Sequence, residues 1–170
     1  MTEPVQHPRI LLSEPALKHT MACADRTGRH ETGGVLLGFR SGSDVFVTDA
    51  VEVPAEIATS VRYVSTEEAR NVAIASFLDR VGSDHPVGYV GTWHSHPGNS
   101  KASPTDKRTL RAEAADAPDL VVMLVLFLGG ERWRLDGFVA HHHKTLEYRR
   151  PHRLLRRDPW VTPASVVPIS

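Results

Sequence analysis

Cysteine is nearly absent from this sequence, and so are long apolar segments. The single cysteine, Cys23, cannot form a disulfide within the chain. The longest apolar run, residues 120–128, is far shorter than the roughly 20 residues that a membrane-spanning helix needs, so we predict a buried strand there. The start of the chain is polar and contains proline, and we expect no signal peptide. These features predict a cytoplasmic protein that does not bind a membrane.

The chain also lacks a net charge. Its 20 Lys and Arg residues balance its 20 Asp and Glu residues, so no overall field attracts nucleic acid or an anionic surface, and we expect no nucleic-acid partner. Residues 144–157 are a local exception, with six basic residues against one acid, Glu147. A solvated basic tail is the favoured interpretation of this segment. Docking to an acidic partner is the alternative.

The order of the predicted elements indicates a single α/β domain over residues 9–148, followed by a basic, proline-containing tail over residues 149–170. A chain of 170 residues is long enough to bury a sizeable core. Apolar spacing and capping residues predict helices over residues 13–28, 65–81 and 103–115. Alternating or continuous apolar residues predict strands over residues 35–39, 45–53, 87–94, 120–128 and 132–139. A short strand at residues 145–148 is left open, and about the last 18 residues are predicted to be an extended tail.

Two histidines separated by one residue, His94 and His96, lie at the end of a predicted strand over residues 87–94, with His94 as its last residue. Side chains alternate along a strand, so both imidazoles project to the same face and can bind one ion. A carboxylate ten residues further on, Asp106, can supply a third ligand. Zinc held by two histidines and one carboxylate keeps a coordination position open, which is typical of hydrolytic sites. We therefore predict a catalytic zinc site.

The third ligand has a competing explanation. Ser103, Pro104 and Asp106 have the arrangement of a helix start, with serine as N-cap, proline at the first helical position and an acid at the third. Capping alone explains these residues on local grounds. The two interpretations are compatible, because a helix N-terminus directed at the site can be capped and still present one carboxylate to an ion.

These residues together resemble the signature of the JAMM (MPN+) metalloprotease family. The matching residues are a glutamate, Glu31, before a glycine-bearing strand, then His94-Ser95-His96-Pro97, then Ser103-Pro104-Thr105-Asp106. The resemblance extends over about residues 9–140. It implies a single MPN domain, related to the deaminase fold, in which helices pack against a mixed, curled sheet with zinc at its edge.

The resemblance also implies a role for each site residue. His94, His96 and Asp106 would bind Zn²⁺. Glu31 would be the general base, which takes a proton from the attacking water and passes it to the leaving amine. Ser103 would stabilise the oxyanion. Without the family, Glu31 would be interpreted as an exposed residue before a strand.

The chain is too short to contain the long insertions with which eukaryotic deubiquitinases of this family grip ubiquitin. In this respect it resembles the compact prokaryotic branch of the family. The loop from His96 to Ser103 contains six residues where the family usually has seven. The implied activity is that of a zinc isopeptidase or peptidase that cleaves the amide bond after the C-terminal tail of a ubiquitin-like protein. Activating and conjugating enzymes would be further partners of such a system.

Three other functions compete with cleavage after the tail of a ubiquitin-like protein. Processing of a sulfur-carrier protein would use the same chemistry on another substrate. A non-catalytic MPN scaffold in a larger assembly is disfavoured, because such modules typically lose metal ligands. A zinc deaminase is disfavoured because one cysteine cannot supply its Pro-Cys-x-x-Cys motif.

Several conspicuous residues are predicted to be structural. Alternation places Ser95 and Trp93 on the face of the strand opposite the ligands, in packing or supporting positions. Gly33, Gly34 and Gly38 lack the spacing of a phosphate-binding loop and are predicted to allow close approach of the backbone. The three histidines at residues 141–143 are predicted to lie in a solvated loop.

Overall fold

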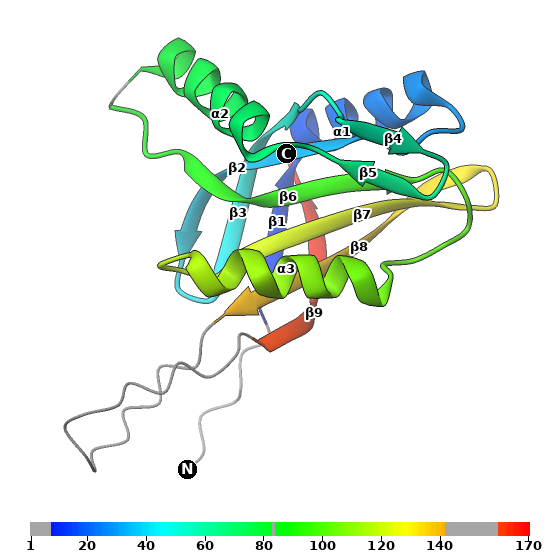
Figure 1. Cartoon of the computed structure of the whole chain (residues 1–170). Helices are drawn as coiled ribbons and strands as arrows, with labels where there is room; N and C mark the ends of the chain where they lie inside the picture. The colour runs from blue at the N-terminus through cyan, green and yellow to red at the C-terminus, as the bar shows by residue number, and fades with distance from the viewer. Residues whose placement is uncertain (1–7, 83, 142–159) are drawn as a thin grey trace, which may run out of the picture.

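A curled, mixed β-sheet forms the centre of the computed structural model, which describes residues 8–82, 84–141 and 160–170 (Figure 1). Seven strands follow one another in the order β1-β3-β2-β6-β7-β8-β9, and β9 pairs with β1, so that the sheet closes on itself. The strands are β1 (Arg9–Ser13), β2 (Gly33–Ser41), β3 (Asp44–Glu52), β6 (Gly88–His96), β7 (Val121–Gly129), β8 (Arg132–His141) and β9 (Trp160–Ile169). The predicted single α/β domain with a mixed, curled sheet is confirmed.

Three helices begin at hydroxyl side chains that accept a hydrogen bond from the third helical N–H. They are α1 (Glu14–Thr27), α2 (Glu67–Val81) and α3 (Pro104–Asp116), with Ser13, Thr66 and Ser103 as their N-caps. The cap of α2 is Thr66, one residue after the start of the helix predicted over residues 65–81. Gly28 and Gly82 end α1 and α2 with positive φ angles, which glycine adopts without strain.

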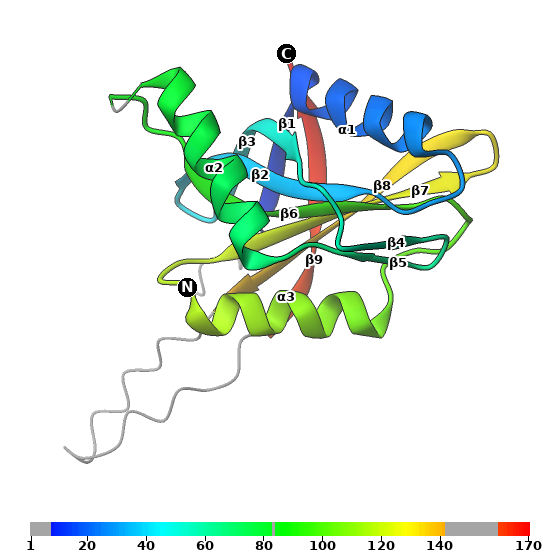
Figure 2. The same ribbon diagram turned by 45° about the horizontal axis from the view of Figure 1, so that its top comes forward.

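The two faces of β7 are buried against different helices. Val122, Leu124 and Leu126 pack in the cluster that includes α1, whereas Val121, Met123 and Val125 pack against α3. Both sets are buried, as expected of a continuous apolar run in the middle of a sheet. Figure 2 shows α1 and α3 on opposite sides of the sheet. A third cluster joins α2 to the sheet through Phe77, while Val81 at the end of α2 is exposed.

Residues 160–169 correct the prediction of an extended tail. They form β9, which pairs with β8 over residues 160–164 and with β1 over residues 165–169. Each residue of β9 therefore has only one neighbouring strand in these ladders. Such positions tolerate Pro163 and Pro168, whose nitrogens cannot donate hydrogen bonds. The proposed strand at residues 145–148 and the rest of the basic segment lie outside the described residues.

Two further elements were not predicted. The strand β1 is a short run of five residues directly before the Ser13 cap. A small hairpin, β4 (Ile57–Thr59) and β5 (Arg62–Val64), stands apart from the main sheet as a two-stranded sheet. Among the described residues, no helix is long and apolar enough to cross a membrane.

Candidate metal centre

The strand β6 carries the two histidines at its C-terminal end. It lies between β2 and β7, where His94 is paired with Gly33 on one side and with Val125 on the other. The intervening Ser95 is buried, as is Trp93, so both occupy the supporting positions that alternation predicted. This central position in the sheet holds the two imidazoles beside each other.

The first turn of α3 brings Asp106 to the same place. The Ser103 hydroxyl accepts a hydrogen bond from the Asp106 N–H (3.1 Å), and the Asp106 carboxylate accepts one from the Ser103 N–H (2.6 Å), which completes a capping box. The same carboxylate lies 3.4 Å from His94 Nε2 through Oδ1 and 3.6 Å from His96 Nε2 through Oδ2. The structure thus joins the two interpretations of Asp106, because one carboxylate caps α3 and faces both imidazoles.

The donor atoms of the three residues fit a zinc ion. His94 Nε2 and His96 Nε2 lie 3.2 Å apart, and the ligand atoms of all three residues lie within 4.8 Å of one another. Tetrahedral ligands about 2.0–2.1 Å from zinc are separated by about 3.3 Å, close to the separations seen here. Among the residues that the structure describes, this is the one group of three or more potential ligands gathered so closely.

A hydrogen bond from Nδ1 of His96 leaves the other ring nitrogen, Nε2, able to bind a metal. His96 Nδ1 lies 2.6 Å from the Ser100 carbonyl oxygen, which can only accept a hydrogen bond. Nδ1 must therefore carry the proton, and in the neutral ring the lone pair of Nε2 points into the site. Metal-bound histidines are oriented by partners of this kind. The sequence could not reveal this contact, since it depends on the path of the loop.

Glu31 completes the buried side of the site. Its Oε1 lies 3.7 Å from His96 Nε2, and the residue is only 6% exposed. Burial raises the pKa of the Glu31 carboxyl to about 7, and the Asp106 charge acts in the same direction, whereas His96 and a hydrogen bond from the Tyr63 backbone oppose the rise. A carboxyl group of this kind can accept and release a proton near neutral pH.

Asp106 has the opposite electrostatic character. Burial alone would raise the pKa of its carboxyl group. The hydrogen bond and charge of His94, together with the hydrogen bonds of Ser103, outweigh burial and hold that pKa below its usual value. Asp106 therefore remains an anion, as a metal ligand must. The pKa values of the two carboxyl groups of this site are thus shifted in opposite directions by their surroundings.

The segment that carries Glu31 is held by β6 and by the hairpin. The Thr32 N–H donates to the buried Ser95 hydroxyl (3.0 Å), and the Ser95 N–H donates to the Thr32 carbonyl (2.7 Å). On the other side, the Glu31 N–H donates to the Thr59 carbonyl of β4 (2.7 Å). Ser95 is therefore more than a packing residue, because its hydroxyl helps to place the predicted base.

Gly33 allows the hairpin to lie directly against β2. A Cβ atom at this position would come within 2.6 Å of the Tyr63 ring and 2.5 Å of the Trp93 carbonyl oxygen. The Tyr63 hydroxyl donates to the Val53 carbonyl, which anchors β5. Gly33 thus confirms the predicted close approach of the backbone. The role of Tyr63 was missed, since no turn motif marks the short hairpin in the sequence.

A partly buried polar group lies between α2, α3 and β6. The Arg70 guanidinium donates to the Glu113 carboxylate (2.8 Å), and the Tyr89 hydroxyl donates to the same group (3.5 Å). Burial raises the pKa of Glu113, while Arg70 opposes that rise. These residues were not singled out from the sequence, in which they are widely separated. They connect the two helices that flank the metal centre.

The other predicted site residues have different outcomes. The Ser103 hydroxyl accepts the capping bond from the Asp106 N–H, and a hydrogen bond of the same side chain helps to lower the pKa of the Asp106 carboxyl group. His141 belongs to the end of β8. The side chains of the histidines at residues 141–143, and the basic residues that follow them, lie outside the described residues.

Comparisons with known proteins agree with this fold. A family model described as prokaryotic homologs of the JAB domain matches residues 13–136. Among solved structures, the solution structure of protein DSY2949 from Desulfitobacterium hafniense superposes with a TM-score of 0.65 at 17% sequence identity. That match covers 94% of this chain and 92% of the other, and at this identity it shows a shared fold alone. No curated protein sequence matches the chain.

Proposed function

Because the chain belongs to the family of prokaryotic homologs of the JAB domain, we propose that it is a zinc-dependent isopeptidase or peptidase. Its substrate would be the amide bond after the C-terminal tail of a ubiquitin-like protein. One observation carries the proposal. Two imidazole nitrogens and a carboxylate face one point, and the buried Glu31 lies 3.7 Å from one of those nitrogens.

A bound zinc ion polarises a carbonyl group and makes water a stronger nucleophile at neutral pH. Glu31 lies where it can accept a proton from the attacking water and pass it to the leaving amine. The Ser103 hydroxyl can donate a hydrogen bond to the carbonyl oxygen as negative charge develops there. His94, His96 and Asp106 would hold the metal, and the Ser100 carbonyl keeps His96 in its metal-binding tautomer.

The hairpin suggests how the substrate tail is held. Within the described part of the chain, the edges of the two-stranded sheet β4–β5 pair with no further strand, and the Thr59 carbonyl of this sheet accepts a hydrogen bond from the Glu31 N–H. An extended peptide could add to such an edge by main-chain hydrogen bonds. A tail next to Glu31 and Pro97-Gly98 would need small residues at the scissile bond, and a Gly-Gly terminus meets this need.

The first test is the metal content of the purified chain. We expect about one zinc ion per chain by elemental analysis, and none in His94→Ala, which leaves one histidine and one carboxylate. Protein purified without chelator that contains no zinc, and binds none when zinc is added, would exclude the metalloenzyme. The three residues would then form a hydrogen-bonded network in a non-catalytic scaffold.

The second test addresses the substrate. A fusion of a ubiquitin-like protein that ends in Gly-Gly is compared with the same fusion carrying two bulkier residues there. Faster cleavage of the Gly-Gly fusion is expected, and equal rates would favour a general peptidase. A sulfur-carrier protein ending in Gly-Gly, tested in parallel, separates processing of that substrate from deconjugation. Neighbouring genes for activating and conjugating enzymes would favour deconjugation.

A further inference from the structure

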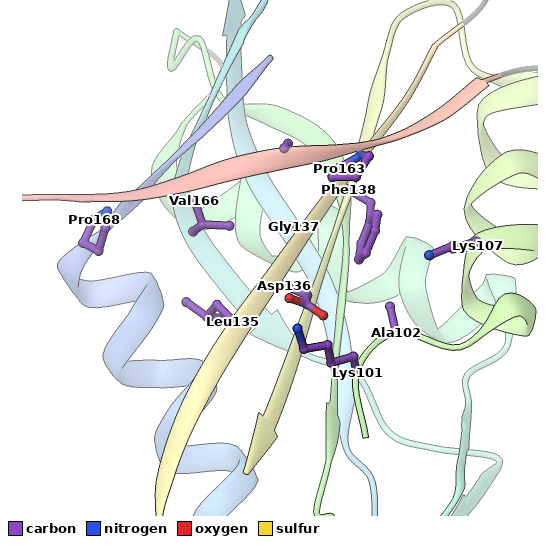
Figure 3. Close-up of a pocket in the computed structure, with 11 residues that line it drawn as sticks. Lys101, Ala102, Lys107, Leu135, Asp136, Gly137, Phe138, Pro163, Val166 and Pro168 are labelled. Atoms are coloured by element: carbon purple, nitrogen blue, oxygen red, sulfur yellow. The ribbon is translucent and has the colours of Figure 1, made fainter. Parts of the chain in front are cut away.

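A cavity lies where β9 separates from β8. Their ladder ends at the pair Gly137–Ala164, and residues 165–169 pair with β1 instead. At the point of separation, a Cβ atom on Gly137 would lie only 2.5 Å from the Val166 side chain. A cavity of about 530 Å³ lies at this fork between the two strands, and the loop before α3 and the first turn of α3 form its other wall (Figure 3).

Apolar side chains form about half of the wall of this fork cavity. Leu135 and Phe138 contribute from β8, and Val166 and two prolines from β9. The volume lies within the range of about 300–1,000 Å³ that is typical of sites for small molecules. A cavity of this size with one apolar side suits a ligand with an apolar body.

Charged side chains also line the fork cavity. Lys107 Nζ lies 4.9 Å from the centroid of the Phe138 ring, and Lys101 Nζ lies 5.9 Å from that of Phe127. Within the described ranges, neither lysine has a carboxylate oxygen within the 4.0 Å of an ion pair. Asp136 is the third charged group of the lining. Two ammonium groups and one carboxylate leave one positive charge, which complements a monoanion.

The fork cavity adjoins the metal centre without sharing its ligands. His94, Val125 and Asp136 are partners in one row across β6, β7 and β8, which places Asp136 two strands, or about 10 Å, from His94. The connecting loop serves both places. Ser100 accepts the hydrogen bond of His96, and the next residue, Lys101, lines the cavity.

We propose that the fork cavity is a second ligand site, which binds a small organic monoanion with an apolar body. The anionic group lies between Lys101 and Lys107, and the body packs on Leu135, Phe138 and Val166. Asp136 accepts a hydrogen bond from the ligand or, where the ligand has no donor, remains solvated. The proposal is independent of the proposed hydrolysis, because no metal ligand touches the cavity.

The test uses phenylbutyrate as the probe and phenylbutanol and phenylbutylamine as its neutral and cationic counterparts. Amide NMR shifts of the full chain are followed during titration. Phenylbutyrate should shift residues 101–107, 135–138 and 163–168, and bind about two- to fivefold more tightly than phenylbutanol, since an ion pair that is partly exposed contributes up to about 1 kcal/mol. Phenylbutylamine should bind most weakly.

Matched variants decide where the probe binds. Lys101→Gln and Lys107→Gln should each weaken phenylbutyrate about two- to fivefold, whereas Lys18→Gln on α1 should not. His94→Ala, which removes a proposed metal ligand and leaves the bond between His96 and Ser100 in place, should leave phenylbutyrate binding unchanged and so excludes binding through zinc. Equal affinity for the three probes, loss of binding in His94→Ala, unchanged binding in both lysine variants, or no binding would each overturn the proposal.

Discussion

The N-termini of α1 and α3 have nearly the same local sequence but different consequences. Each begins with a serine cap, an early proline and an acid in the first turn. In α1 the acid is Glu14, which is exposed and pairs with Lys18. In α3 it is Asp106, which binds back to its own cap and faces two imidazoles. The position of the acid within the turn therefore separates a solvated helix end from one whose acid faces two histidines.

The strongest test of this comparison replaces the two acids. Asp106→Ala should lose zinc and lower the hydrolysis rate about 10⁴-fold, since several kcal/mol of transition-state stabilisation come from a bound metal. Glu14→Ala should change neither. Zinc content by elemental analysis and a cleavage assay measure the outcome. If Asp106→Ala keeps its zinc, Asp106 is only a cap.

Glu31 extends the comparison to a carboxylate outside any helix. Glu31→Gln should keep zinc and the fold but lower turnover about 10²–10⁴-fold, the usual contribution of a general base. Elemental analysis and a circular dichroism spectrum are the controls. Loss of zinc in this variant would make Glu31 a direct ligand and contradict the proposed division of roles.

The two serine caps provide a smaller and more specific test. Ser103→Ala and Ser13→Ala should each lower the free energy of unfolding by about 1 kcal/mol. Only Ser103→Ala should also lower turnover, by about 10²–10³-fold if its hydroxyl stabilises the oxyanion. Urea unfolding and steady-state kinetics on both variants separate the effects. Equal turnover in the two would limit Ser103 to capping.

Ser95 should show the smallest effect on catalysis. Ser95→Ala leaves the buried Thr32 N–H without its acceptor, which should cost about 1–3 kcal/mol of stability. Turnover should fall only about tenfold, because Glu31 keeps its bond to Thr59 and is displaced rather than removed. An effect on turnover as large as that of Glu31→Gln would assign Ser95 a direct part in the chemistry.

The parts of the site that could be predicted are those set by local geometry. Alternation along β6 brings His94 and His96 to one face, and the cap residues set the first turn of α3. The positions of β9 and the hairpin could not be predicted, because their pairing joins residues far apart in the chain. Prolines in β9 and the brevity of β4–β5 also weaken the local signal for a strand. The Ser100 contact and the Arg70–Glu113 pair depend in the same way on tertiary packing.

The loop between the second histidine and α3 has unequal freedom along its length. Gly98 is tied to β7 through the Leu128 N–H, and Ser100 is tied to His96, while Ser103 and Asp106 are locked in one register by their reciprocal bonds. Asn99 lies between Gly98 and Ser100, and Lys101 and Ala102 lie between Ser100 and Ser103. Substitutions at Lys101 and Ala102 would reshape the fork cavity and leave His94, His96 and Asp106 in place. What this cavity accepts can thus change while the group of two histidines and one carboxylate stays the same.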